Sequence, residues 1–575
     1  MRLIVPISVG GWRRIFSRWD IVAVLLILGL LVFLAEASRH LLQPLADLQQ
    51  KPVSLDPANL PEYAARTTLR MLIAMILSLL FTFTYATLAA KSKHAERLLV
   101  PLLDILQSVP ILGFISITVV FFMALAPGRV LGAEFAAIFA IFTSQAWNMA
   151  FSFYQSLRTV PTELTEASRN FRLGPWMSFW RVDVPFAMPQ LIWNMMLSMS
   201  GSWFFVVASE AISVGNTTIT LPGIGSYIAV AIQHRDLAAV GYAIVTMLIV
   251  ILIYDQLLFR PLVAWADRFR FEQEPGLLPP QSWVLNVLRR SRLVDRLTHP
   301  FAVLWRLVLL ARWSKDGAQQ KEQPRTHSRW VAFQWTAIAF GFGAVAIWQL
   351  ALFVTQDITL SDVATTLLLG LATLTRIVVL IALATIVWVP IGIWVGTRPH
   401  FANVVQPIAQ FLAAFPANVL FPIAVSVIVV LKLNPNIWLS PLMILGTQWY
   451  ILFNVVAGAI AIPAELRAAG ANFRVRGWLW WRRIAIPAVL PYYVTGAITA
   501  SGGSWNASIV AEVASWGNEH LRAEGLGAYI AQQTDAGDFH HIVLGIAVMS
   551  FFVVLINRTF WRPLYLYAER KFLLG

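Results

Sequence analysis

The chain of 575 residues contains no cysteine and few charged residues. Without cysteine it can form neither disulfides nor thiolate metal sites. Only 13% of its residues are charged while 58% are hydrophobic, and soluble domains contain roughly 45–50% hydrophobic residues. A water-soluble protein of this size could not cover its surface with so few charges, so much of that surface must face a lipid bilayer.

The sequence also lacks the short motifs of several enzyme classes. It has no Gly-x-x-x-x-Gly-Lys-Ser/Thr phosphate loop, and therefore no ATP site of that kind. It has no His-Glu-x-x-His motif and no nucleophile elbow. We therefore expect this chain to be no enzyme and to hold no metal or cofactor, with any ATP and Mg²⁺ bound by a partner.

The charges that are present are mostly basic, with a formal net charge of +14. They lie in short segments between apolar runs, which is typical of the cytoplasmic loops of a membrane protein and not of a nucleic-acid groove. Basic residues also occur near both chain ends. This distribution predicts that both termini are cytoplasmic and that the basic segments contact lipid headgroups.

About twelve apolar segments are long enough to cross the membrane, since a helix needs roughly 20 residues to do so. All should be helices, because open strands and loops leave backbone groups unsatisfied in lipid. The segments of the first half are 20–37, 66–90, 100–125, 131–157, 187–212 and 237–259. Those of the second half are 330–354, 363–396, 404–431, 436–461, 489–513 and 540–560. The expected fold class is an all-α polytopic membrane protein.

The first apolar segment has two interpretations. Arg13, Arg14 and Arg18 precede it, and Ala35-Glu36-Ala37 follows it, which is also the arrangement of a cleaved signal peptide. We favour a retained transmembrane helix, because the remainder of the chain is embedded in the membrane.

The two halves of the chain repeat each other. Residues 161–172 match residues 463–474 at an offset of 302 (463 minus 161), and this offset holds for about a hundred residues. It pairs Glu210 with Glu512, and upstream an offset of 306 pairs Arg70 with Arg376 and Pro110 with Pro416. Shared hydrophobicity cannot explain matching Glu, Arg and Pro residues. The pattern predicts a parallel repeat of two six-helix domains with a pathway between them.

The repeat also predicts the domain boundaries. The first domain is expected at 1–265 with its core at 66–265, and the second at 330–575 with its core at 370–568. Residues 266–329 form the longest polar stretch, in which several arginines alternate with large apolar residues. Such a segment is expected to contain an amphipathic helix on the cytoplasmic membrane surface that tethers the two domains.

Each half has a polar, helix-forming loop between its fourth and fifth apolar segments. An ordinary connector needs only a few residues, yet these loops are long and closely similar at 161–184 and 463–486. A surface that docks a similar partner twice explains the similarity better than a connector does. The residues expected to form the docking surfaces are Glu163, Glu166, Ala167, Ser168, Arg172, Pro175, Pro185, Glu465, Ala468, Ala469, Gly470, Arg474, Gly477 and Pro487.

Glu166-Ala167-Ser168, followed by Pro175-Trp176 and Val184-Pro185, resembles the EAA loop of binding-protein-dependent ABC transporter permeases with the type I importer fold. Gly201-Ser-Trp203, Ser209-Glu210 and Gly223-x-Gly225 are similar to the nitrate, sulfonate, taurine and bicarbonate branch of that family. The resemblance covers nearly all of both domain cores, so two permease domains are fused in one chain.

This resemblance implies a multi-pass subunit of the bacterial inner membrane. It implies that each loop docks as a coupling helix into one nucleotide-binding domain of a cytoplasmic ABC ATPase. It also implies that a periplasmic substrate-binding protein delivers a small anion, which the two halves pass by alternating access.

The sequence departs from the family pattern in both loops. The family's glycine six residues after the Glu is replaced by Arg172 and Arg474, and the second loop has Ala468 in place of the Glu. Either arginine could pair with a carboxylate of the ATPase or with a lipid headgroup. The missing Glu predicts that the two ATPase contacts are not equivalent.

Glu210 and Glu512 lie late in the fifth apolar segment of each half, where an ionisable residue is costly and indicates function. We favour a structural role, in which each Glu accepts backbone hydrogen bonds from a glycine-rich segment and holds an extracellular gate. These segments are Gly223 to Gly225 and Gly525 to Gly527. The alternative is direct contact with the solute.

Uncharged polar and aromatic residues of the fourth and fifth segments are candidates for lining the pathway. They are Gln145, Trp147, Ser202, Trp203, Gln448, Trp449, Ser504 and Trp505. For the serines, packing between helices with hydrogen bonds is an equally good explanation.

Two other functions would fit a duplicated membrane protein. An ion-coupled secondary transporter would need no ATPase and would place coupling charges near the membrane centre, and the repeated loop argues against it. A membrane scaffold would leave the paired Glu residues and the glycine-rich segments unexplained.

Overall fold

The computed structural model describes residues 53–214, 217–269, 282–291 and 357–572, with scattered positions within 20–29, 293–307 and 337–352. The chain divides into two compact units. The first comprises residues 1–37, 156–193 and 253–325, and the second comprises 38–155, 194–252 and 326–575. The predicted helices at 20–37 and 330–354 lie largely outside the described residues.

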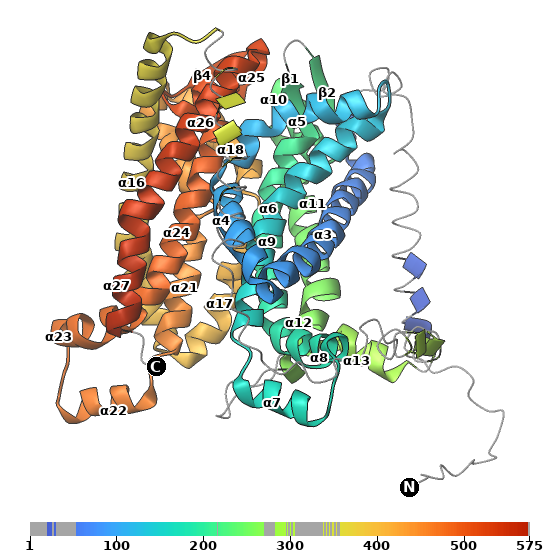
Figure 1. Ribbon diagram of the computed structural model, residues 1–575. Coiled ribbons are helices and arrows are strands. Elements are labelled where there is room, and N and C mark those ends of the chain that lie inside the picture. Colours follow the sequence, from blue (N-terminus) through green and yellow to red (C-terminus); the bar gives the residue numbers. More distant parts are fainter. Residues whose placement is uncertain are drawn as a thin grey trace. The chain divides into compact units, whose positions relative to one another are not determined.

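The described part of the chain is built almost entirely from helices (Figure 1). In the first half these are η1 (Pro57–Asn59), α3 (Leu60–Lys91), α4 (Lys93–Ser108), α5 (Ile111–Leu125), α6 (Val130–Arg158), α7 (Thr162–Asn170), α8 (Pro175–Ser178), η2 (Phe179–Asp183), α9 (Val184–Glu210), α10 (Ile224–Gln233), α11 (Leu237–Tyr254), η3 (Asp255–Phe259), α12 (Arg260–Ala266), η4 (Asp267–Phe269) and α13 (Trp283–Arg290).

The second half repeats this order. Its helices are α16 (Leu360–Gly396), α17 (Pro399–Ala414), η5 (Ala417–Leu420), α18 (Phe421–Val430), α19 (Pro435–Trp438), α20 (Ser440–Ile444), α21 (Gln448–Ile460), α22 (Ala464–Asn472), α23 (Trp478–Trp480), η6 (Trp481–Ala485), α24 (Ile486–Ala511), α25 (Leu526–Ala536), α26 (Phe539–Ile556), η7 (Asn557–Trp561) and α27 (Arg562–Phe572).

Seven helices among the described residues are long and apolar enough to cross a membrane, and a bent pair makes an eighth. They begin at Pro57, Val130, Pro175, Leu237, Leu360, Trp478 and Phe539. Each coincides with an apolar segment expected from the sequence. The helical, multi-pass architecture is therefore confirmed for the described part of the chain, although fewer than twelve long spans are found there.

Two of the predicted spans are broken rather than continuous. Segment 100–125 is split between α4 and α5 at Pro110, and segment 404–431 is split between α17 and η5 at Pro416. Proline lacks the N–H that a helix interior needs, and it disfavours helical backbone at the residue before it. Val109 and Phe415 accordingly have extended backbone, with ψ of 126° and 128°.

A third predicted span, 436–461, is bent. The short helices ending at Ile444 meet α21 at an angle of 41°, across a break at residues 445–447. Its counterpart in the repeat is α6, which runs without interruption from Val130 to Arg158. The break therefore distinguishes the second half from the first.

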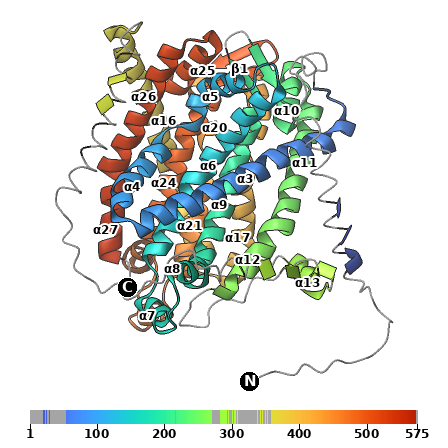
Figure 2. The same ribbon diagram turned by 45° about the vertical axis from the view of Figure 1, so that its right-hand side comes forward.

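The structure also contains two short β-hairpins that the sequence did not predict. β1 (Ala211–Val214) pairs antiparallel with β2 (Thr217–Thr220), and β3 (Val513–Trp516) pairs antiparallel with β4 (Glu519–Arg522). Each hairpin joins a long helix, α9 or α24, to a short one, α10 or α25. Figures 1 and 2 show β1, α10 and α25 at the same end of the helices of the second unit.

Within the second unit, residues of the two sequence halves share one apolar core, which includes Ile111 and Trp505. Among the residues that the structure describes, two side-chain hydrogen bonds cross between the halves, and we call this pair of bonds the seam. The backbone N–H of Ile111 donates to Asn506 Oδ1 at 2.7 Å. Asn418 Nδ2 donates to the carbonyl of Phe204 at 3.1 Å.

The first unit contains α13, which falls within the stretch predicted from the sequence to be a linker. Its N-cap Ser282 accepts a hydrogen bond from the backbone of Leu285 at 3.2 Å. The helix buries Val284 and Val287 and exposes Arg289 and Arg290, so it is amphipathic.

Candidate functional site

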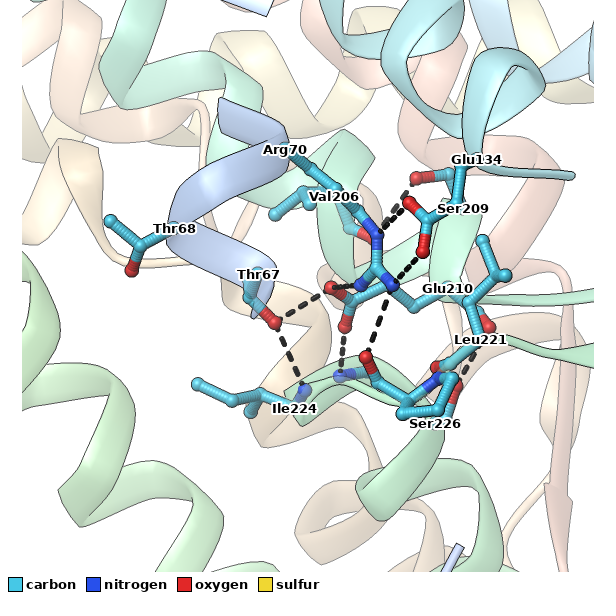
Figure 3. A network of polar contacts seen from close by, with 12 residues as sticks. Thr67, Thr68, Arg70, Glu134, Val206, Ser209, Glu210, Leu221, Ile224 and Ser226 are labelled. Atoms are coloured by element: carbon cyan, nitrogen blue, oxygen red, sulfur yellow. Dashed lines mark hydrogen bonds and ion pairs between the residues drawn. The ribbon is translucent and has the colours of Figure 1, made fainter. Parts of the chain in front are cut away.

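A buried ion network occupies the first half (Figure 3). Arg70 of α3 binds Glu134 of α6 through two parallel hydrogen bonds, Nε to Oε2 and Nη2 to Oε1, both 2.6 Å long. Its remaining terminal nitrogen, Nη1, lies 2.6 Å from Oε1 of Glu210, the last residue of α9. The three side chains are 3%, 6% and 0% exposed. Such a bidentate geometry is the strongest form of this ion pair.

Glu210 also binds the N-terminus of α10. Glu210 Oε2 accepts the backbone N–H of Gly225 at 2.6 Å. Its Oε1 also accepts the hydroxyl of Thr67 at 2.6 Å, and that hydroxyl accepts the N–H of Ile224 at 3.1 Å. A carboxylate at a helix N-terminus satisfies N–H groups that have no partner within the helix. Glu210 therefore joins α3, α9 and α10 at one point.

Glycine is required twice at this point. A Cβ atom at Gly223 would lie 2.3 Å from the Glu210 carboxyl carbon. A Cβ atom at Gly225 would lie 2.2 Å from the backbone oxygen of Val207. The spacing Gly223-x-Gly225 thus lets α10 contact both the carboxylate and the backbone of α9.

The second half contains a corresponding site. Glu512 Oε1 accepts the Thr373 hydroxyl at 2.8 Å and lies 3.1 Å from Arg376 Nη1. Its Oε2 accepts the N–H of Ala528 at 3.1 Å. A Cβ atom at Gly525 would lie 2.2 Å from that carboxylate. These groups occupy the repeat positions of Thr67, Arg70 and Glu210, and Gly527 corresponds to Gly225.

The two sites differ in one partner. Glu134 has Asn436 as its counterpart at the 302-residue offset. Asn436 Oδ1 accepts Arg376 Nη2 at 3.2 Å and the N–H of Glu524 at 2.7 Å. Arg376 is 15% exposed, five times the exposed fraction of Arg70. The charged side chains of the second site therefore sum to zero, whereas those of the first sum to −1. The second site also has longer hydrogen bonds, and its arginine is more exposed to solvent.

Sequence reasoning found Glu210 and Glu512 but missed their partners Thr67, Arg70 and Glu134. The pairing of Arg70 with Arg376 in the repeat was a signal that could have found the arginines. Glu134 has no acidic counterpart, so the repeat holds no signal for it.

The two candidate docking loops have the same backbone fold. Helices α7 and α22 are both nine residues long and both follow a proline, Pro161 or Pro463, with φ −56° and ψ 143°. Each loop then ends in a five-residue π-helix, η2 or η6, just before Pro185 or Pro487.

The C-terminal ends of α7 and α22 explain why the family pattern has glycine where this chain has Arg172 and Arg474. The N–H of Leu173 donates to the carbonyl of Ser168 at 3.1 Å, and the N–H of Arg172 to that of Arg169 at 2.9 Å. This is the Schellman cap, whose second-to-last residue takes a left-handed conformation that glycine adopts most easily. Arg172 and Arg474 have φ of 51° and 53°, so both arginines are held in that conformation.

The loops diverge after this cap. In the first, Pro175 begins α8, whereas in the second the matching residue is Gly477 with φ 56° and ψ −138°. That conformation is accessible only to glycine. Arg467 of the second loop also donates to the last carbonyls of α21, Ala459 at 2.9 Å and Ile460 at 3.2 Å. The second loop is therefore attached to its neighbouring helix by a contact that Thr165, at the matching position, does not make.

Most of the predicted docking residues are accessible. Glu163, Glu166, Glu465 and Ala468 are exposed, whereas Ser168 and its counterpart Gly470 are buried. Ser168 donates to Ser178 at 2.8 Å, which closes the first loop on itself. Sequence reasoning missed the most exposed apolar residues of the loops. These are Phe171 and Phe473, which are 79% and 80% exposed beside the two arginines.

Most of the candidates for lining the pathway are packed between helices. Trp203 and Trp505 are 2% and 1% exposed. Ser202 bonds to Ser144 at 2.7 Å, and Ser504 to Thr447 at 3.1 Å. The serines thus serve as hydrogen-bonded packing between helices.

The glutamines and the remaining tryptophans also have partners. Gln145 is fully buried and accepts the Ser78 hydroxyl at 3.3 Å, while Gln448 accepts the indole N–H of Trp388 at 3.0 Å. The ring centroids of Trp147 and Phe81 lie 5.3 Å apart, and those of Trp449 and Trp388 lie 5.0 Å apart. A cavity of about 80 Å³ lies near these residues, and none of the eight candidates lines it.

Known proteins resemble about a third of the chain. It is 30% identical over 188 residues to the bicarbonate transport system permease protein CmpB of Synechocystis sp., a match that covers 33% of this chain and 64% of that protein. It is 25% identical over 202 residues to the nitrate import permease protein NrtB of the same organism, covering 35% and 70%. It is 27% identical over 193 residues to the glycine betaine/carnitine transport permease protein GbuB of Listeria monocytogenes, covering 33% and 63%.

A family profile matches the chain twice, at residues 78–260 and 388–560. The two matches together cover more than half of the chain and fall once in each half of the repeat. The chain therefore belongs to the family of binding-protein-dependent transport system inner membrane components, and it carries two copies of the family's domain.

Proposed function

We propose that this chain forms the translocation pathway of an ATP-driven importer for a small anion. The observation that carries the proposal is the pair of docking loops. Although they differ at several residues, the two loops keep the same helix length, the same proline entry and the same left-handed cap. Retention of a strained cap in both halves is explained by a partner that must be bound twice in the same way.

The partner that fits these loops is an ATPase with two nucleotide-binding domains. Each loop presents one short helix tipped by an exposed phenylalanine, Phe171 or Phe473, next to an arginine. Large aromatic residues and arginines are the residues that most often dominate binding energy at interfaces. Glu166 is present only in the first loop, so the two contacts differ in charge.

The substrate proposal rests on the relatives. The names of two of them specify bicarbonate and nitrate, which are small oxyanions, while a third specifies glycine betaine and carnitine. The glycine-rich segments and paired Glu residues of this chain are similar to those of the branch that contains the nitrate and bicarbonate permeases. We therefore assign a small anion, delivered by a periplasmic substrate-binding protein.

The membrane topology follows from the same assignment. The docking loops face the cytoplasm of a bacterial inner membrane, and both termini lie on that side. The Glu210 and Glu512 networks then lie at the outer ends of α9 and α24, where they hold α10 and α25 in place. Each network is proposed to be a fixed point of the extracellular gate rather than a solute site, because its carboxylate is already fully hydrogen-bonded.

A co-expression experiment tests this function. The purified chain alone should hydrolyse no ATP, and its complex with the cognate ATPase and binding protein should show ATP-dependent anion uptake in proteoliposomes. The control is the same complex with an ATPase that binds but cannot hydrolyse ATP. Uptake by the chain alone, driven by an ion gradient, would show that it is a secondary transporter instead.

The arginines at the loop caps provide a narrower prediction. Replacing both Arg172 and Arg474 with Glu should lower ATPase coupling by about tenfold or more, because a reversed charge at an interface costs several kcal/mol. Expression should be unchanged, since both side chains are exposed. Coupling is measured as the stimulation of ATP hydrolysis by loaded binding protein.

The matched control replaces both arginines with glycine. Glycine favours the left-handed cap, which costs other residues about 1–2 kcal/mol, so these loops should be at least as stable as the native ones. We expect the glycine variant to keep more coupling than the charge-reversal variant. Unchanged coupling after charge reversal would remove any docking role for the arginines.

A further inference from the structure

The cavity of about 80 Å³ lies within the second unit, where the two sequence halves meet. Residues of α9, among them Gly201 and Phe204, line it from the first half, and residues of α21 and α24, among them Tyr450 and Gly503, from the second. Its volume exceeds the roughly 10–15 Å³ that one water needs. It can therefore hold a solute of a few heavy atoms.

The break between α20 and α21 opens onto this cavity. Gly446 and Thr447, which lie in the break, are both lining residues. Helix α21 then starts at Gln448, so its N-terminal N–H groups and the positive end of its dipole lie beside the cavity. Interrupted helices inside a membrane protein persist where the irregular backbone lines a cavity, and they mark ion and substrate sites in transporters.

Tyr450 supplies a hydroxyl group to the same space. A Cβ atom built on Gly201 would lie 3.3 Å from this hydroxyl, so the hydroxyl reaches from α21 to the surface of α9. Among the described residues it has no hydrogen-bond partner. At the matching position of the first half, Asn148 is already bonded to Ser198 at 2.9 Å. The unpartnered Tyr450 hydroxyl therefore has no equivalent at the repeat position of the first half.

The residues that line the cavity are uncharged. Among the described residues the lining contains no carboxylate and no basic side chain, and its polar side chains are the hydroxyls of Ser200, Thr447 and Tyr450. The Ser200 hydroxyl already donates to the Met196 carbonyl at 2.9 Å, and the Thr447 hydroxyl is bonded to Ser504 at 3.1 Å. The Tyr450 hydroxyl is therefore the donor available to a ligand, and together with the helix N-terminus it favours an anion. The absence of a compensating cation among these residues makes a divalent anion costly to enclose, because a buried charge without a partner keeps its desolvation penalty.

We infer that this cavity holds the solute during passage and selects a small monovalent oxyanion, with the Tyr450 hydroxyl as the donor to it. This inference rests on the proposed function. It adds the charge class of the substrate and a selecting residue to that function.

The test uses the complete importer in proteoliposomes, with nitrate as the probe and sulfate as the divalent comparison. Replacing Tyr450 with Phe removes only the hydroxyl. The number of nitrate ions carried per ATP hydrolysed should fall about tenfold, the usual effect of losing a hydrogen bond to a charged group. Tyr492 is 40% exposed and its ring packs on Gly458. Tyr492→Phe is the matched control and should behave as the native chain.

A second variant keeps the test decisive if the first assembles poorly. Gly201→Ala places a methyl group 3.3 Å from the hydroxyl and should also lower nitrate carried per ATP. Native nitrate-to-ATP ratios in both variants would overturn the inference, as would sulfate uptake by the native importer at the same rate as nitrate. A native complex with no ATP-dependent uptake of any solute would instead overturn the proposed function.

Discussion

Replacing Arg70 with Met is expected to prevent accumulation of folded protein, whereas the same replacement at Arg376 should leave a folded chain of reduced stability. Arg70 contacts two buried carboxylates at 2.6 Å each. Removing one partner of a buried ion pair costs about 3–5 kcal/mol, which is a large part of the roughly 5–15 kcal/mol by which a domain is stable. Arg376 faces one carboxylate at 3.1 Å and is partly solvated, so its loss should cost less.

The measurement is the fraction of monodisperse protein in detergent after heating, followed by size-exclusion chromatography. The two arginines are each other's matched control, since they occupy equivalent repeat positions. Adding Glu134→Gln and Glu210→Gln to the Arg70→Met chain should restore part of the folded fraction, because the uncompensated charges are then gone. Equal losses at Arg70 and Arg376 would contradict this account of the network.

Replacing Gly225 with Ala should abolish uptake and destabilise the chain by about 1–3 kcal/mol or more, the usual cost of overpacking. The new Cβ would lie 2.2 Å from the backbone oxygen of Val207, and a helix backbone cannot move aside as a side chain can. Helix α10 would have to leave α9, which would break the 2.6 Å bond from the Gly225 N–H to Glu210. Uptake and thermal stability of the complex are the measurements.

The control for this change is Gly241→Ala, in α11. An added Cβ there meets nothing within 4 Å, and alanine in a helix interior is favoured over glycine by about 0.5–1 kcal/mol. Gly527→Ala should reproduce the Gly225 defect, because its Cβ would lie 2.4 Å from the Ser508 oxygen. A Gly225→Ala chain that transports normally would show that α10 can detach from α9 without consequence.

The long helices were predictable because hydrophobic runs of sufficient length have one stable form in lipid. The breaks at Pro110 and Pro416 were not predicted, since hydropathy does not register the loss of a backbone N–H. The bend before Gln448 has even less signal, as its counterpart α6 is continuous. The β-hairpins were missed because four-residue strands are too short for their alternation to be distinguished from a loop.

The candidate sites were partly predictable for a different reason. A glutamate in an apolar segment is rare enough to be noticed, so Glu210 and Glu512 were found. Which groups they contact depends on tertiary packing, and Glu134 and Tyr450 have no matching residue in the other half to reveal them. Arg172 and Arg474 were noticed as departures from a family pattern, but their left-handed backbone became visible only in the structure.

The seam makes the two halves unequal partners. Both of its amides, Asn506 and Asn418, come from the second half, while the first half contributes only the backbone of Ile111 and Phe204. At the matching positions the first half has Phe204 and Leu112. Two copies of the first half could therefore form neither bond, whereas two copies of the second half retain every group needed. If the gene were divided, the first half could form these two hydrogen bonds only with the second half, whereas the second half could form both with another copy of itself.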